Sequence, residues 1–121
     1  MRFLIILLCC VLLTDCSSKD SDVMCSEEFR YITVLFSTSM PDSFKTCAES
    51  SGDTLVFEQL FQDQMMAVVM SDAYLHLVKN KSEVFSLICY KSDSIVLKER
   101  YVVGGNDCHI SLIEGRTLIS L

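Results

Sequence analysis

The cysteines and the two histidines, His76 and His109, are the residues of this chain best suited to chemistry. Cys108 directly precedes His109, and a cysteine nucleophile with a histidine base is a common catalytic pair. Neighbouring side chains on a strand point to opposite faces, however, so we expect these two to diverge. No Gly-x-Ser-x-Gly, His-Glu-x-x-His or Gly-rich phosphate loop occurs. We therefore expect no catalytic residues, and an exposed His109 beside a disulfide cysteine.

Metal-binding and acid–base patterns are also missing. The Cys-x-x-Cys and His-x-x-x-His spacings of zinc sites do not occur, so we expect no metal and no cofactor. Glu27 and Glu28 form a carboxylate pair, but adjacent acids at a strand entrance are usually a solvated edge. Met65, Met66 and Met70 are interpreted as core filling, because methionine packs irregular gaps without a polar partner.

The first residues have the pattern of an export signal. Arg2 precedes an apolar run at residues 3–13, and Cys16 follows it. A basic residue, an apolar core and an acylated cysteine are the parts of a bacterial lipoprotein signal. The core, about eleven residues long, is too short for a permanent span of roughly 20. We expect a signal peptide at 1–15, a lipid on Cys16, a flexible tether at 16–24, and membrane attachment through that lipid alone.

Asp15 departs from this pattern, since a small residue usually stands before the acylated cysteine. If Cys16 is not acylated, cleavage near Ser17 or Ser18 releases a secreted domain. That product would be a disulfide-bonded viral or eukaryotic β domain that binds a host factor. Both alternatives place the protein outside the cytosol.

Export brings the remaining cysteines into an oxidising compartment, where they can pair. Three of the seven belong to the leader, and the other four, Cys25, Cys47, Cys89 and Cys108, allow three full connectivities. We favour a bridge between Cys25 and Cys108, because each lies at the polar edge of a strand-like segment. Cys89 lies within an apolar segment, where a buried hydrophobe and a second bridge fit equally well.

The charge balance is acidic and excludes one large class of partner. The chain carries 16 Asp and Glu against 10 Lys and Arg, a net charge of −6. Nucleic-acid binding depends on Lys and Arg that release counterions, and no basic stripe is present. We expect no nucleic-acid partner and no charge-driven docking on anionic lipid.

Most of residues 25–121 predicts strands of one domain. Residues 29–36 are rich in β-branched and aromatic residues, and residues 85–90 and 95–103 flank a four-residue connection at 91–94. A last hairpin is expected from 109–113 and 117–121 around a turn at 114–116. Such short strands predict a mostly β chain folded as a small antiparallel β-sandwich, transthyretin-like or Ig-like. The Cys-Trp-Cys signature of Ig domains is not met, because the chain has no Trp.

The middle of the chain supports two interpretations. Apolar residues at helical spacing predict one amphipathic helix at about residues 56–69. Alternatively, 54–57 and 67–70 are strands joined by a polar turn at 62–64. Asp72 is placed to cap one helical turn at 74–77.

Three segments resemble a known group of proteins. They are CSEEFRYI at 25–32, YKSD at 90–93, and YVVGGNDCHI at 101–110 with EGR at 114–116. Over residues 16–121 the chain is similar to small exported lipoproteins of Bacteroides-type bacteria. The resemblance implies a transthyretin-like or carboxypeptidase-regulatory-like β-sandwich at the cell envelope, without assigned chemistry. It also implies the pairing of Cys25 with Cys108. The acidic run at 17–22 resembles the signal that sends such lipoproteins to the outer face of the outer membrane. It fits an ordinary solvated linker equally well.

These observations predict a cell-envelope lipoprotein of the outer membrane, facing the periplasm or the cell surface. It would be a non-enzymatic binding or structural module, and its protein or glycan ligand is unknown. Loops at 37–43 and 62–64 are available for contact. The competing class is a small hydrolase, which requires a pocket holding His76 or His109 within hydrogen-bond reach of a Ser or Cys.

Overall fold

The computed structural model describes residues 24–57 and 62–121. The predicted signal peptide at 1–15, the lipid-bearing Cys16 and the tether up to residue 23 lie outside these residues. Within the described part of the chain, no helix is long and apolar enough to cross a bilayer.

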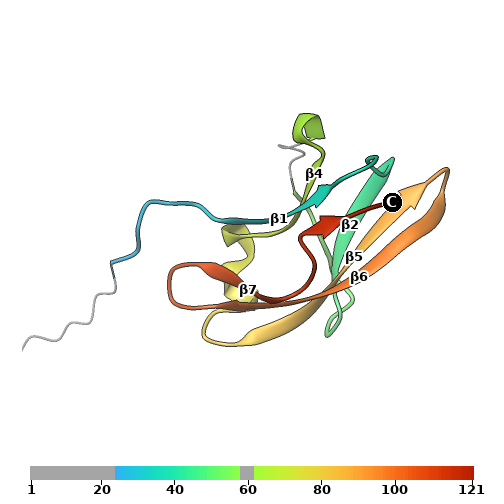
Figure 1. Cartoon of the computed structure of the whole chain (residues 1–121). Coiled ribbons are helices and arrows are strands. Elements are labelled where there is room, and N and C mark those ends of the chain that lie inside the picture. Colours follow the sequence, from blue (N-terminus) through green and yellow to red (C-terminus); the bar gives the residue numbers. More distant parts are fainter. Residues whose placement is uncertain (1–23, 58–61) are drawn as a thin grey trace, which may run out of the picture.

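The described chain forms two sheets that pack face to face (Figure 1). The order of strands is β4-β1-β8 in the smaller sheet and β3-β2-β5-β6-β7 in the larger one, and β1 with β8 is the parallel pair. The prediction of a mostly β protein with a small, antiparallel-rich β-sandwich is confirmed. The strands are β1 (Tyr31–Phe36), β2 (Ser43–Ala48), β3 (Thr54–Leu55), β4 (Met66–Ser71), β5 (Ser82–Lys91), β6 (Ser94–Gly105), β7 (Ile110–Glu114) and β8 (Leu118–Ile119), and the 3₁₀ helices are η1 (Gln62–Gln64) and η2 (Asp72–Leu77).

The core lies between the sheets and follows the alternation of the strands. β1 turns Ile32, Val34 and Phe36 inward, while Tyr31 and Leu35 on the same strand stay partly exposed. Burying each large apolar side chain contributes about 1.5 to 3 kcal/mol to folding. The larger sheet meets β1 with Phe85, Leu87, Cys89, Tyr101 and Val103, all nearly fully buried.

The helix predicted at residues 56–69 is wrong. β4 occupies its second half and pairs with β1, which buries Ala67, Val69 and Met70 in the core. β-branched residues pack well on a pleated sheet, and here that tertiary pairing outweighs the helical spacing. The two-strand interpretation is closer, although β3 is shorter than predicted and belongs to the other sheet. Residues 58–61 lie outside the described residues.

The predicted helical turn exists as η2, but Ser71 caps it instead of Asp72. The Ser71 hydroxyl oxygen accepts a hydrogen bond from the backbone N–H of Ala73 at 3.3 Å. Asp72 lies inside the helix, and its carboxylate is occupied by three donors from other parts of the chain. The prediction located the turn correctly and misassigned the cap.

The last hairpin is also wrong, because β7 and β8 belong to different sheets. β7 pairs with β6, whereas β8 crosses to pair in parallel with β1. The crossing passes Gly115, whose φ of +143° and contact with the Tyr101 ring leave no room for a side chain. The Tyr101 hydroxyl donates to the carbonyl of Arg116 at 2.6 Å, which fixes the crossing segment against β6.

The turn between β5 and β6 is tighter than the predicted four-residue connection. Lys91 and Ser94 are already paired, so Ser92 and Asp93 make the whole turn. Their φ values are 51° and 63°, the left-handed conformation that a type I′ turn requires at both positions. The Ser92 N–H donates to the Asp42 carboxylate at 2.7 Å and ties the turn to the segment before β2.

Candidate functional site

A disulfide joins Cys25, just before β1, to Cys108 in the turn between β6 and β7. The predicted pairing is therefore present in the structure. The bridge closes a loop with a sequence separation of 83. In the chain-entropy model a loop of this length stabilises the fold by roughly 4 to 5 kcal/mol.

The other two cysteines of the described chain, Cys47 and Cys89, are free. Cys89 is buried, and burial raises the pKa of its thiol to about 11. A thiol with so high a pKa stays protonated near neutral pH and is unreactive. Of the two roles left open for Cys89, the structure shows the buried hydrophobe.

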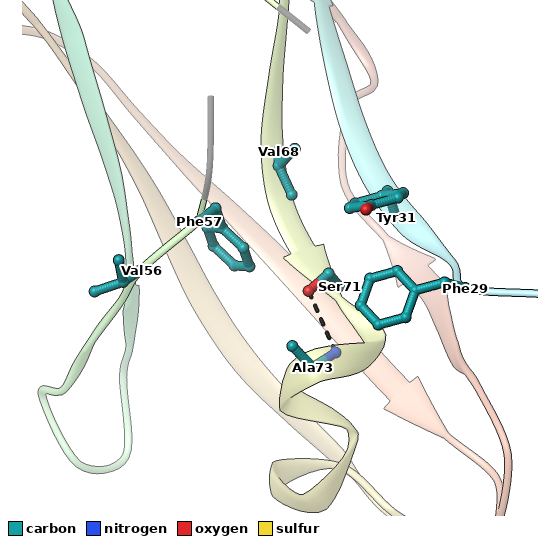
Figure 2. A pocket seen from close by; sticks show the side chains of 7 residues that line it. All are labelled: Phe29, Tyr31, Val56, Phe57, Val68, Ser71 and Ala73. Atoms are coloured by element: carbon teal, nitrogen blue, oxygen red, sulfur yellow. Dashed lines mark hydrogen bonds between the residues drawn. The ribbon is translucent and has the colours of Figure 1, made fainter. Parts of the chain in front are cut away.

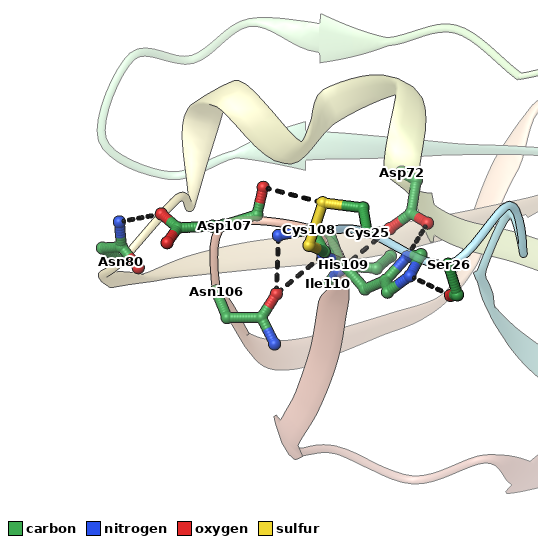
Figure 3. The surroundings of a disulfide bond; sticks show 9 residues. All are labelled: Cys25, Ser26, Asp72, Asn80, Asn106, Asp107, Cys108, His109 and Ile110. Atoms are coloured by element: carbon green, nitrogen blue, oxygen red, sulfur yellow. Dashed lines mark hydrogen bonds and ion pairs between the residues drawn. A yellow bond between two sulfur atoms is a disulfide. The ribbon is translucent and has the colours of Figure 1, made fainter. Parts of the chain in front are cut away.

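A chain of hydrogen bonds lies beside the disulfide (Figure 3). The Ser26 hydroxyl lies 2.8 Å from Nε2 of His109, and Nδ1 of His109 lies 2.7 Å from the carboxylate of Asp72. His109 is buried, contrary to the predicted exposed position. The reason is the turn before β7: Asn106 Oδ1 accepts from the backbone N–H groups of both Cys108 and His109, which directs the imidazole toward η2.

Asp72 is the centre of this cluster. Besides the imidazole, it accepts the backbone N–H groups of Arg30 and Ile110, each at 2.9 Å. Burial by itself raises the pKa of the Asp72 carboxyl, but the hydrogen bonds from His109, Ile110 and Arg30 outweigh it and lower that pKa overall. The ionised carboxylate thus holds together η2, the start of β7 and the segment before β1.

The order of Ser26, His109 and Asp72 matches a nucleophile, its base and the carboxylate that orients the base. Sequence reasoning missed it because Ser26 and His109 are 83 positions apart and follow no motif. Acyl transfer also needs backbone donors for the oxyanion and a pocket for the substrate. The N–H groups of Cys108 and His109 already donate to Asn106, and neither cavity described below is lined by Ser26 or His109.

The other predicted residues are placed apart from this cluster. His76 is exposed on η2 and lines a cavity of about 200 Å³ with residues of the β2–β3 turn and the start of β5. Glu28 forms a surface ion pair with Arg30 at 3.5 Å. Met70 is fully buried in the core and Met65 packs against the core, as the core-filling interpretation predicts. That interpretation is wrong for Met66, which is half-buried beside the outward-facing Leu35. No group of three or more His, Cys, Asp or Glu in the described residues is arranged to hold a metal.

The two loops predicted for contact, at residues 37–43 and 62–64, are both part of the ordered fold. The connection between β1 and β2 is bound to the end of the chain, since the Thr38 hydroxyl donates to the carbonyl of Leu121 at 2.9 Å. Residues 62–64 form η1, immediately before β4. A more distinct surface feature lies between the segment before β1 and residues 56–57, neither of which the sequence analysis proposed as a contact surface.

That feature is an apolar trough of about 300 Å³ against the outward side of the smaller sheet (Figure 2). Phe29 and Tyr31 stand on one side of it and Val56 and Phe57 on the other. Phe29 is 50% exposed and Val56 is 78% exposed. The full lining is Phe29, Tyr31, Val56, Phe57, Val68, Ser71 and Ala73.

Tyr74 fixes the far wall of the trough. Its hydroxyl accepts from the Val56 N–H at 2.7 Å and donates to the Val56 carbonyl at 3.0 Å. The ring of Phe57 packs edge-on against the Tyr74 ring, with centroids 5.3 Å apart. The trough therefore has a wall held by two hydrogen bonds and an aromatic contact.

Such a lining suits an apolar group. It offers few hydrogen-bonding groups to a polar ligand, because Ser71 and Tyr31 are the residues of the lining that carry a side-chain hydroxyl. The Ser71 hydroxyl is already engaged as the cap of η2. No family model, curated protein or solved structure matches this chain.

Proposed function

We propose that this protein is an exported, non-enzymatic binding module of the cell envelope, attached to the outer membrane through a lipid on Cys16. The observation that carries the binding role is the apolar trough, whose aromatic walls remain partly exposed. Binding of an apolar ligand is favourable where it removes such exposed apolar surface from water. The disulfide supports export, because such bonds persist mainly in oxidising compartments.

Binding is tested with Nile red, an uncharged apolar dye. We expect saturable fluorescence enhancement by the native protein, and at least tenfold weaker binding by Val56→Glu, which puts a charge on the wall of the trough. Ile95→Glu is the matched control, because Ile95 is also exposed but lies at the start of β6. Equal loss in both variants, or no saturable binding, contradicts the binding role.

Attachment is tested by mass spectrometry of the protein isolated from its own cells. A diacyl or triacyl group on an N-terminal Cys16 supports the lipid anchor. A free N-terminus near Ser17 or Ser18 contradicts it and favours the secreted alternative, a disulfide-bonded β domain that binds a host factor.

A small hydrolase is the second candidate, and the hydrogen-bonded order of Ser26, His109 and Asp72 favours it. A fluorophosphonate probe separates the two classes, because it reacts covalently with an activated serine. For a binding module we expect no more labelling of the native protein than of Ser26→Ala. Labelling that Ser26→Ala abolishes would identify a hydrolase.

A further inference from the structure

The outward side of the smaller sheet is apolar well beyond the trough. The strand register places Leu35 beside both Met66 on β4 and Leu118 on β8, and Thr33 beside Val68. Leu118 is 59% exposed and Leu35 is 38% exposed. We use the name outer apolar face for the surface formed by Phe29, Tyr31, Leu35, Met66 and Leu118, together with Val68, which is only 3% exposed. Thr33 is the polar member of this face.

The larger sheet presents a different surface to solvent. Lys45 on β2 and Lys98 on β6 both pair with Ile88 on β5, so the two lysines lie on the same side of the sheet. Arg100 on β6 forms an ion pair with Glu114 on β7. In contrast, none of the outward residues of β1, β4 and β8 in the described register is charged. An uncharged, partly exposed sheet face on an otherwise charged domain marks a surface that contacts something other than water.

The N-terminal segment leaves the domain beside this face. Phe29 is on the face, and Cys25 and Ser26, four and three positions earlier, are held by the disulfide and by His109. Eight residues separate Cys16 from Cys25, and fully extended they span at most about 30 Å. A lipid on Cys16 would therefore keep Cys25, which precedes the Phe29 end of the outer apolar face, within about 30 Å of the bilayer.

A second copy of the chain fits this face less well. The exposed parts of its side chains amount to on the order of 500 Å², compared with about 800 Å² per partner in a standard interface. Two copies also repel each other, because each carries a net charge of −6. A bilayer requires no minimum area, and aromatic side chains such as those of Phe29 and Tyr31 suit its interface.

We propose that the outer apolar face rests on the surface of the membrane to which the protein is anchored, in contact with uncharged lipid. This inference rests on the proposed lipid attachment. A few half-exposed apolar side chains bind a bilayer only marginally, and a tether makes such contact persistent by raising the effective concentration. The acidic chain would favour zwitterionic over anionic lipid.

Single tryptophans report the contact directly, because the chain has none of its own. Phe29→Trp and Leu118→Trp place the reporter on the outer apolar face, and Ile95→Trp places it on the exposed start of β6. The acylated proteins are reconstituted into phosphatidylcholine vesicles containing brominated lipid. We expect at least twofold stronger quenching of both face reporters than of Ile95→Trp, and weaker quenching when phosphatidylglycerol is included.

Equal quenching at all three positions overturns the proposal. A blue shift of the face reporters without vesicles, together with a doubled mass in light scattering, overturns it in favour of a dimer. If mass spectrometry finds Cys16 unmodified, an N-terminal hexahistidine on nickel-chelating lipid replaces the natural anchor in the same measurement. The face is then tested independently, so failure of the lipid anchor and failure of the docking are distinguished.

Discussion

At the scale of single residues, Asp72 organises the polar part of the protein. One carboxylate accepts hydrogen bonds from Arg30, in the segment before β1, and from His109 and Ile110, which are neighbours at the start of β7. A buried donor that loses its acceptor costs about 1 to 3 kcal/mol. Asp72 therefore holds the segment before β1 against the start of β7. The same contacts place Ser26, His109 and Asp72 in a triad-like order.

Asp72→Asn should lower the free energy of unfolding by about 1 to 3 kcal/mol at neutral pH, because the amide nitrogen must face at least one of the three donors that the carboxylate accepts. The folded pKa of Asp72 is lowered, so the stability from its ionised form is present above the unfolded pKa of about 4 and is lost as the pH falls through the folded value. Urea unfolding measured from neutral pH to below about pH 4 should therefore show that the free energy of unfolding falls less steeply with decreasing pH in the variant than in the native protein. Asp53→Asn, at an exposed site in the β2–β3 turn, is the control.

At the scale of elements, local sequence patterns predicted those strands whose formation depends on neighbouring residues. The strands predicted at residues 29–36, 85–90 and 95–103 from their composition and from the connection at 91–94 correspond to β1, β5 and β6, and the fold depends on them. The destination of β8 depends on Gly115 meeting Tyr101, and the polar cluster depends on η2 meeting the β6–β7 turn. Contacts between distant segments leave no periodic signal, so the sequence predicted the strands better than the site.

The turn at Ser92 and Asp93 offers a test at this scale. Both residues adopt positive φ, a conformation that Asn-Gly adopts with little strain. The double variant Ser92→Asn with Asp93→Gly should raise the free energy of unfolding by about 1 kcal/mol in urea titration. The hydrogen bond to the Asp42 carboxylate uses only the backbone N–H of residue 92, so the double variant retains it. Asp93→Val should instead destabilise, since a β-branched residue at positive φ is strained, and the opposite order would refute the turn assignment.

At the scale of the whole molecule, the sandwich has one charged outer surface and one apolar outer surface, and the disulfide between Cys25 and Cys108 is a covalent staple between the segment before β1 and the turn before β7. The staple and the Asp72 cluster both hold residues 25–30, the segment that ends where β1 begins. Their shared effect is to fix the position at which the chain leaves the domain beside the outer apolar face. In the proposed docking on the membrane, the polar cluster would orient the outer apolar face toward the bilayer.

Removal of the staple tests this arrangement. In Cys25→Ser with Cys108→Ser we expect a loss of up to roughly 4 kcal/mol in the free energy of unfolding, because the unfolded chain regains the freedom of a long loop. Cys47→Ser, at a free cysteine, should change it by less than about 0.5 kcal/mol. Hydrogen exchange adds a local measurement: the Arg30 amide, bound to Asp72, should lose protection in the double variant more than the amides of the β5–β6 pair do. A uniform loss of protection across both regions would show that the staple stabilises the domain globally and does not specifically hold the segment beside the outer apolar face.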